Sequence, residues 1–327
     1  MPQNRIRAID LFSGAGGSSW GARAAGVKIV AAFDVWDVAC LTHTANFPRT
    51  KYYSKRLEEL NLNSVVKELG RIDLIIASPE CTNHSPARGK RPHSEESKNT
   101  AFQVVRFARE LKPRWIVVEN VVSMRRWNRY EEFKKSMESL GYNLREQVLD
   151  ASDFGVPQTR RRLFILADLQ HEPREIVSKG VKLASARTIV NLNGKYVWTP
   201  LRKRNRAQAT LRRASRAIKV VGEDKPFLIV YYGSDHAGGW QKLNRPLRTI
   251  TTLDRFAIVK PSKEGHLMRM LQVPELQAAM GMPKAMKFRI GTRRDQLKMI
   301  GNAVCPPVMR KVITQLTANL KGIGRRG

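Results

Sequence analysis

The chain has 327 residues, of which 42% are hydrophobic, and this is enough for a folded core, so a disordered chain is excluded. Its 59 Lys and Arg residues far outnumber its 28 Asp and Glu residues, which gives a formal net charge of +31. Such an excess predicts a nucleic acid as the partner, although charge alone does not separate an enzyme from a protein that only adheres to DNA or RNA.

The cysteines and the first residues of the chain indicate the cellular compartment, and the cysteines favour a reducing one. Cys40, Cys81 and Cys305 are an odd number without a C-x-x-C pair, which argues against a disulfide framework and against a zinc site. Segment 1–7 has no apolar stretch of the signal-peptide kind, and no window approaches the roughly eighteen apolar residues of a membrane span. We therefore expect a soluble cytoplasmic protein that binds no metal. If it comes from a bacterium or a phage, we expect it to be associated with the nucleoid.

Apolar runs of strand length alternate with helical patterns in the first half of the chain. The expected strands are residues 6–12, 28–33, 72–77, 115–118 and 163–167. The expected helices include residues 18–25, 37–46 and 98–111. This alternation predicts an α/β fold in which a parallel sheet is covered by helices on both faces.

A glycine-rich turn follows the first expected strand. It reads Asp10-Leu-Phe-Ser-Gly-Ala-Gly-Gly-Ser-Ser19, and its glycines would let the backbone approach a ligand at the top of a parallel sheet. Asp34 closes the second strand, 20 residues after Gly14, and could accept hydrogen bonds from ribose hydroxyls. The pattern is compatible with NAD and with S-adenosylmethionine, and a tight turn without a ligand stays open.

Two later strands end in residues that can perform covalent and acid–base chemistry. Cys81 opens a polar loop at the carboxyl edge of strand 72–77, where nearby cations would favour the thiolate nucleophile. Glu119 follows strand 115–118, faces the same crevice and could donate a proton. Taken singly, a cysteine is more often a small buried hydrophobe, and a glutamate is commonly a cap or half of a salt bridge. The pair in one crevice favours a catalytic site.

Two arginines precede strand 163–167. In Gln158-Thr-Arg160-Arg-Arg162, alternation along a strand puts Arg160 and Arg162 on one face and Arg161 on the other. Two guanidinium groups could therefore face one ligand. Ordinary solubility charges are the alternative.

The composition changes after Asp168. Segment 171–224 is rich in Arg and Lys and poor in long apolar runs, which predicts a second, smaller domain. Its densest basic residues are Arg202, Lys203, Arg204, Arg206, Arg212, Arg213 and Arg216. They form either a solvated face or contacts to DNA phosphates, and the sequence leaves both open. Segment 292–320 returns to an amphipathic helical pattern, interrupted by Gly301-Asn302 and Pro306-Pro307.

In this order, the segments resemble the motifs of the DNA cytosine-5 methyltransferase family, nearly from end to end. Only about residues 169–225 lie outside the resemblance. The matching segments are Asp10-Leu-Phe-Ser-Gly-Ala-Gly-Gly17, Pro79-Glu80-Cys81, Glu119-Asn120-Val121, Gln158-x-Arg160-x-Arg162, Arg245-Pro-Leu-Arg-Thr-Ile-Thr-Thr252 and Ile300-Gly-Asn-Ala-Val304.

The resemblance implies a Rossmann-like S-adenosylmethionine-dependent methyltransferase fold with a smaller target-recognition domain. It divides the chain into a catalytic and cofactor-binding domain (1–167), the target-recognition domain (168–285) and C-terminal helices (286–327) that return to the catalytic domain. Segment 82–97 would be the loop that closes on the DNA.

The resemblance also implies a mechanism. The target cytosine is rotated out of duplex DNA, and Cys81 attacks C6 of its ring while Glu119 donates a proton to N3. C5 then takes the methyl group, and loss of the C5 proton and of the thiolate releases 5-methylcytosine. Arg162 would hold the base or lower the pKa of the thiol, and Arg160 would bind a nearby phosphate.

The expected contacts to S-adenosylmethionine, whose product is S-adenosylhomocysteine, come from several strand ends and from the closing motif. They are Phe12, Ser13, Gly14, Ala15, Gly16, Gly17, Asp34, Val35, Pro79, Asn302 and Ala303.

Some positions depart from the family pattern. Glu80 stands where a proline is usual, and Thr82 stands where a glutamine is usual. Lys55-Arg56-Leu57 stands where an aspartate often reads the adenine amino group, and Asp34 replaces the more frequent glutamate. None of these changes removes a catalytic group.

Duplex DNA is the expected partner of a monomeric enzyme, and a companion restriction enzyme is a further candidate partner. The nearest alternative is the same chemistry on transfer RNA, against which the separate recognition domain argues. An inactive DNA-binding relative and a dinucleotide oxidoreductase are the alternatives from other classes. The set of Cys81, Glu119 and Arg162 favours a methyltransferase over both.

Overall fold

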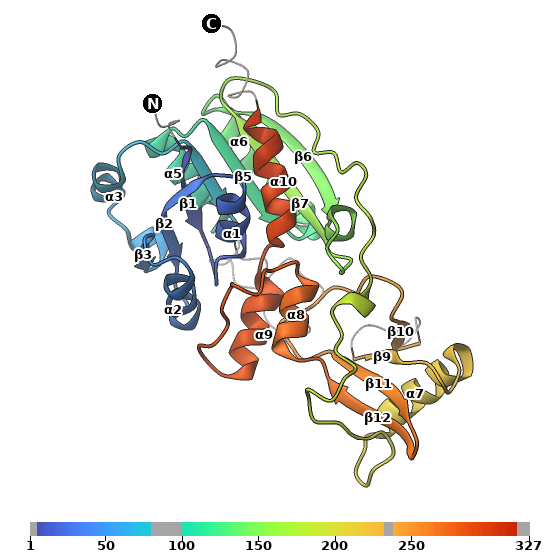
Figure 1. Ribbon diagram of the computed structural model, residues 1–327. Helices are drawn as coiled ribbons and strands as arrows, with labels where there is room; N and C mark the ends of the chain where they lie inside the picture. The colour runs from blue at the N-terminus through green and yellow to red at the C-terminus, as the bar shows by residue number, and fades with distance from the viewer. Residues whose placement is uncertain (1–4, 80–99, 232–237, 319–327) are drawn as a thin grey trace, which may run out of the picture.

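The computed structural model describes residues 5–79, 100–231 and 238–318. Its larger part is built on a seven-stranded sheet with the order β3-β2-β1-β4-β5-β7-β6 (Figure 1). The strands are β1 (Arg7–Leu11), β2 (Lys28–Asp34), β3 (Lys51–Ser54), β4 (Leu74–Ala77), β5 (Trp115–Asn120), β6 (Asn143–Asp150) and β7 (Arg161–Asp168). The predicted α/β fold class is confirmed.

The strands β1 to β5 are parallel, as predicted, but the prediction is wrong for the strand expected at 163–167. β7 runs antiparallel to β5, with Glu119 opposite Phe164, and β6 runs antiparallel to β7. The chain between β6 and β7 contains only a 3-10 turn, whereas a parallel pair needs a longer crossover connection. The short connection therefore imposes the antiparallel direction.

The sequence analysis also missed both edge strands of this sheet. The residues of β3 are exposed or half-buried, and most residues of β6 are half-buried. An edge strand pairs on one side only and stays partly solvated, so it needs no continuous apolar run.

Helices cover both faces of the large sheet, as predicted. Ala8 and Ile9 are neighbours in β1 and point to opposite faces, where they belong to two different hydrophobic clusters. The helices are α1 (Gly17–Ala24), α2 (Asp37–Asn46) and α10 (Pro306–Leu316) on the first face, and α3 (Leu62–Leu69), α5 (Ala101–Leu111) and α6 (Tyr130–Glu138) on the second.

The smaller part is a five-stranded antiparallel sheet with the order β10-β9-β11-β12-β8 (Figure 1). Its strands are β8 (Thr199–Pro200), β9 (Phe227–Val230), β10 (Trp240–Lys242), β11 (Phe256–Ser262) and β12 (Gly265–Met270). Helix α7 (Gln208–Val221) covers one face, so that Ala214, Phe227 and Val259 share a separate small core. The seven-stranded and five-stranded sheets span residues 7–168 and 199–270, and the domain limits at 167 and 285 stay a prediction.

After the small sheet the chain returns to the large one. Helices α8 (Val273–Ala279) and α9 (Arg293–Asn302) lie between the two sheets, and α10 packs against α1 (Figure 1). The break between α9 and α10 falls at Asn302 and Pro306, as predicted. The 3-10 turns are η1 (Leu57–Glu59), η3 (Val122–Arg126), η4 (Ala151–Phe154) and η5 (Ala186–Thr188).

Within the described ranges, no helix has the length and apolar character that crossing a bilayer requires. Nor do three or more His, Cys, Asp or Glu side chains of these ranges gather in a geometry that could hold a metal ion.

Candidate active site

Four neighbouring parallel strands end along one edge of the large sheet. Because β2, β1, β4 and β5 are adjacent and parallel, the residues at or just beyond their carboxyl ends lie side by side. These residues are the glycine-rich turn 12–17, Asp34, Pro79 and Glu119. The structure therefore brings together sequence-predicted residues from four separate segments.

The three glycines of the turn have different surroundings. A Cβ atom on Gly16 would come within 2.7 Å of the Phe47 ring, and one on Gly17 within 2.5 Å of the Val304 carbonyl oxygen. These two positions are glycine because protein atoms crowd them. Gly14 has a φ of +51°, and a Cβ there would meet nothing within 4 Å. Only Gly14 therefore borders open space in which a ligand could approach the backbone.

Asp34 organises this turn. Its carboxylate accepts hydrogen bonds from the backbone N–H of Gly14 at 2.8 Å and of Trp36 at 3.0 Å. Each carboxylate oxygen has two lone pairs, so both oxygens can still accept a further hydrogen bond. Val35, next in the chain, is 51% exposed.

Asp10 and His43 lie beneath the turn, and the sequence analysis did not select either as a site residue. The buried Asp10 carboxylate accepts hydrogen bonds from the hydroxyls of Ser18 at 2.6 Å and Ser19 at 2.5 Å, which fixes the first turn of α1. Burial raises the pKa of Asp10 to about 6. Ser19 also contacts His43 Nε2 at 3.1 Å, and burial lowers the pKa of His43 to about 3. The position of Asp10 beside the glycines could have identified it as a site residue, whereas nothing in the sequence distinguishes His43.

Glu119 is held at the end of β5 beside an arginine from β7. It is 6% exposed, and its Oε1 lies 3.2 Å from Nε of Arg162. Burial raises the pKa of Glu119, although the positive charges of Arg162 and Arg160 act in the opposite direction. The side chain is thus placed to hold a proton that an ordinary glutamate would have lost. That Arg160 and Arg162 share one face stays a prediction, although the charges of both act on this one carboxyl group.

Asn120 positions the start of the predicted nucleophile loop. Its Nδ2 donates to the carbonyl oxygen of Pro79 at 3.2 Å, and its Oδ1 accepts from the N–H of Val121 at 2.8 Å. Pro79 is buried and is the last described residue before the gap. Glu80, Cys81, Thr82 and segment 82–97 lie outside the described residues.

Arg160 serves as a structural tie. It is 3% exposed and donates to the backbone carbonyls of Ile250 at 3.0 Å, Gly301 at 2.8 Å and Ala303 at 3.1 Å. These bonds join β7 to the segment before β11 and to the end of α9. The phosphate contact that the resemblance implies for Arg160 is not supported by this geometry, because its guanidinium is committed to carbonyls in the interior.

Gln158 adds to the same connection. It is fully buried, its Oε1 accepts from the N–H of Ile250 at 2.7 Å, and its Nε2 donates to the carbonyl of Ala279 at 3.2 Å. Gly301 approaches so closely that a Cβ on it would lie 2.3 Å from the carbonyl oxygen of Thr251. Arg160 holds the closing motif at the carbonyl of Ala303, and Gly17 of the glycine-rich turn lies against Val304. The closing motif, with Asn302 and Ala303, is therefore fixed near that turn.

A sheet with a glycine-rich turn after β1, an acidic residue after β2 and an antiparallel β7 defines the Rossmann-like methyltransferase class. Within that class, the family model described as C-5 cytosine-specific DNA methylase matches residues 6–318. The chain belongs to this family.

Relatives agree with this assignment, and a solved structure shares the fold. The Type II methyltransferase M.HgiDI of Herpetosiphon aurantiacus is 30% identical over 327 residues, which covers 96% of this chain and 95% of that protein. The human tRNA (cytosine(38)-C(5))-methyltransferase is 28% identical, but over 54% of this chain and 45% of its own length. A prophage-encoded E. coli protein, provisionally described as a DNA modification methyltransferase, has the same fold, with a TM-score of 0.72, 20% identity and coverage of 97% and 99%.

Proposed function

We propose that this DNA cytosine-5 methyltransferase uses Cys81 as nucleophile, Glu119 as proton donor and Arg162 as the partner of Glu119. The observation that carries the proposal is the pair of the buried Glu119 and the half-buried Arg162 at 3.2 Å, on the edge where Pro79 precedes Cys81 in the sequence. Sulfur and carboxyl groups at neighbouring strand ends can reach the same ring of an extruded base.

Each group has a defined task. The Cys81 thiolate forms a bond to C6 of the cytosine, and Glu119 gives its proton to N3, which takes up the charge that the addition would otherwise place on the ring. S-adenosylmethionine, when bound, supplies an electrophilic methyl group. C5 takes that methyl group; a base then removes the C5 proton, the electrons of the C–H bond expel the thiolate, and N3 returns its proton to Glu119. Arg162 keeps Glu119 oriented throughout.

The residues around Gly14 fit the methyl donor. Gly14 borders open space, the Asp34 carboxylate retains acceptor capacity for ribose hydroxyls, and Val35 offers an exposed apolar surface to a purine ring. We assign these three residues to direct contact. Gly16, Gly17 and Asp10 act indirectly, because they shape the turn.

The proposed substrate is duplex DNA, and the protein acts on it as a monomer. We also propose that a companion restriction endonuclease exists. A relative named as a Type II methyltransferase that matches over its whole length supports DNA, whereas the transfer RNA enzyme matches over about half of its length. Incubation with labelled S-adenosylmethionine and either duplex DNA or transfer RNA distinguishes the two substrates. Sequencing of 5-methylcytosine in DNA from expressing cells then gives the target sequence.

The covalent step can be trapped. If Cys81 adds to C6 and the methyl group arrives at C5, release requires loss of the atom already on C5, and fluorine cannot leave as a cation. DNA with 5-fluorocytosine at the target base should therefore stay bound to the protein through denaturing electrophoresis, with one added methyl group, only when S-adenosylmethionine is present.

The trapped peptide should contain Cys81, and the complex should be absent from the Cys81→Ala variant. Cys40→Ala is the matched control and should trap normally, because that thiol is buried beneath β2. Trapping that is equally strong without cofactor would indicate nonspecific crosslinking, and trapping that survives Cys81→Ala would exclude Cys81 as the nucleophile.

A further inference from the structure

A pocket of about 480 Å³ opens at the β8–β12 edge of the small sheet, away from the strand ends that carry Glu119. It lies between β12, the segment around β8 that leads into α7, and the first turn of α9. Among the described residues that line it, four are cationic and none is acidic; the cations are Lys203, Arg206, Arg269 and Arg293. The proposed methylation chemistry assigns no role to this pocket.

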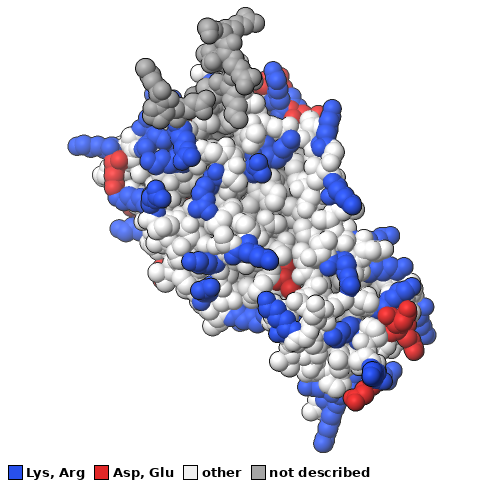
Figure 2. All heavy atoms as spheres, viewed as in Figure 1, with Lys and Arg blue, Asp and Glu red and all other residues white. Residues whose placement is uncertain are grey.

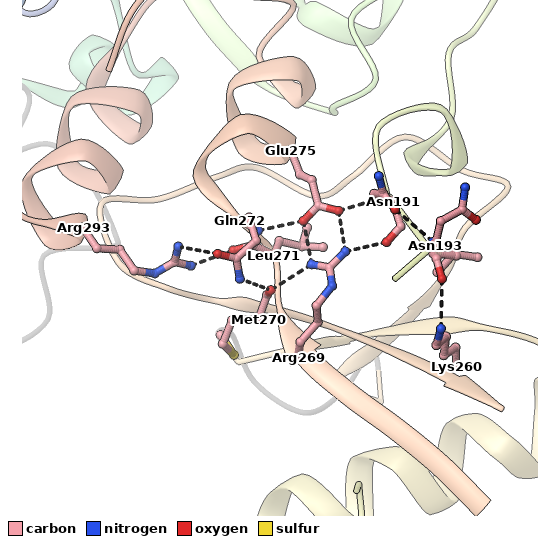
Figure 3. A network of polar contacts seen from close by, with 10 residues as sticks. Asn191, Asn193, Lys260, Arg269, Met270, Leu271, Gln272, Glu275 and Arg293 are labelled. Carbon is pink, nitrogen blue, oxygen red and sulfur yellow. Dashed lines mark hydrogen bonds and ion pairs between the residues drawn. The ribbon is translucent and has the colours of Figure 1, made fainter. Parts of the chain in front are cut away.

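Two of the four cations are fixed in place from behind. Arg269 is 5% exposed and forms two hydrogen bonds to Glu275, at 2.7 and 2.6 Å, while Arg293 pairs with Asp254 at 2.8 Å. Figure 3 shows Arg269 within this network and Arg293 reaching toward Gln272. Nε of Arg269 is buried and has no hydrogen-bond partner among the described residues. The bonds to Glu275 and Asp254 hold both side chains in defined positions at the wall of the pocket.

The other two cations supply uncompensated charge. Arg206 donates to the carbonyls of Leu201 and Pro200 and to the hydroxyl of Thr199, which orders its guanidinium without neutralising it. Lys203 is exposed in the same turn. No described carboxylate pairs with either side chain, so the pocket has a net positive charge and favours an anion.

The rest of the lining is mixed, with the polar Thr199 and Gln272 beside three apolar side chains. Met268 and Met270 belong to the pocket, and Val197 at its rim is 86% exposed, far more than is usual for a valine. A free inorganic anion would gain nothing from this surface. A sugar–phosphate unit would use both the charge and the apolar area.

We propose that this pocket binds a phosphodiester and the adjoining deoxyribose of the substrate DNA, outside the base pairs at the catalytic edge. This inference rests on the proposed function. Helix α9 connects the two places, because Arg293 lies at its start and the Gly301 carbonyl that Arg160 binds lies near its end. A helix of this length spans roughly 15 Å, which corresponds to a phosphate roughly four or five nucleotides from the flipped base.

The test compares two pairs of variants in equilibrium binding to duplex DNA over a range of salt concentrations. Lys203→Ala and Val197→Glu alter the pocket. Lys263→Ala, in the turn between β11 and β12, and Val220→Glu, in the last turn of α7, make the same chemical changes on exposed positions elsewhere in the small part. The pocket variants should bind roughly tenfold more weakly, as expected for one lost charge-assisted contact, and their salt slope should fall by about one unit.

A phosphate scan then locates the contact. Neutral methylphosphonates placed one at a time along a target duplex should identify one position that weakens the unaltered protein but has no further effect on Lys203→Ala. Single-turnover methylation should stay unchanged in the two control variants, Lys263→Ala and Val220→Glu.

Equal effects of the pocket and control variants would show that only overall charge matters, and this would overturn the inference. The inference would also be overturned if every methylphosphonate that weakens the unaltered protein weakened Lys203→Ala to the same extent. Failure of the proposed function gives a different result, namely no methylation by the unaltered protein. Binding to random-sequence duplex still tests the pocket in that case.

Discussion

Glu119 combines burial with two opposing cations, and its ionisation should control the methylation rate. Because burial raises the pKa of Glu119, the carboxyl keeps its proton to a higher pH than an exposed glutamic acid does. The single-turnover rate should therefore fall as the pH rises through that raised pKa.

Replacement of the carboxyl group tests its role directly. Glu119→Gln should lower the methylation rate by at least about a hundredfold, because an amide cannot supply the proton, and the alkaline fall should disappear from the remaining activity. The control is Glu138→Gln, an exposed acid at the end of α6, which should behave as the unaltered protein. An unchanged pH profile in Glu119→Gln would assign proton donation to another group.

Gly14 offers a test of the cofactor site at the same scale. Gly14→Ala and Gly26→Ala both place a side chain at positive φ, +51° and +89°, and neither new Cβ would meet an atom within 4 Å. Both should cost about 1 kcal/mol of stability through backbone strain. Only Gly14→Ala should also weaken binding of S-adenosylmethionine, measured by calorimetry, and equal affinities in both variants would remove Gly14 from the donor site.

At the scale of elements, Arg160 joins three segments that are distant in sequence. Arg160→Ala removes hydrogen bonds to three buried carbonyls, and we expect a loss of at least about 2 kcal/mol of stability. Arg161→Ala, on the exposed opposite face, should change stability by less than about 0.5 kcal/mol. Urea unfolding of both variants measures the difference, and similar midpoints would mean that Arg160 is not a structural tie.

The central strands could be predicted from the sequence because burial on both faces requires continuous apolar runs. Every residue of β5 is buried, including Glu119 at its end, and a carboxyl group after such a run stands out. The short polar edge strands β3 and β6 carry no such signal. The strands of the small sheet were not predicted either, because the basic segment before them hides their pattern.

The tasks of individual site residues were less accessible to sequence reasoning. The carbonyls that Arg160 binds lie 90, 141 and 143 residues further along the chain, and no local pattern reveals such a contact. The turn glycines look equivalent in sequence, yet Gly16 and Gly17 are crowded by protein atoms and Gly14 is not. Tertiary packing decides these differences.

For the whole molecule, the net charge of +31 is widely spread. Figure 2 shows Lys and Arg over both parts on the visible face, with few acidic groups among them. Long-range attraction to DNA is therefore not confined to one patch of this face, and DNA binding should weaken steeply as salt is added.

The basic run before α7 should contribute part of that dependence. Arg202, Lys203 and Arg204 are exposed, whereas Arg206 is engaged with backbone carbonyls, so neutralising all four would also disturb the fold. Replacing the three exposed residues with glutamine should reduce the salt slope by about one unit for each lost phosphate contact. An unchanged slope would identify the run as a solvated surface.

The packing of α10 against α1 has a consequence for synthesis on the ribosome. Gly17 and Gly21 of α1 lie against Val304 and Pro306, which are translated long after α1 itself. Until then, the apolar face of α1 and its sheet has no cover, and a nascent chain with such a face is exposed to aggregation. The binding site proposed for the methyl donor can therefore close only after α10 has been made. We expect truncated products to be inactive even when they contain Cys81, Glu119 and Arg162.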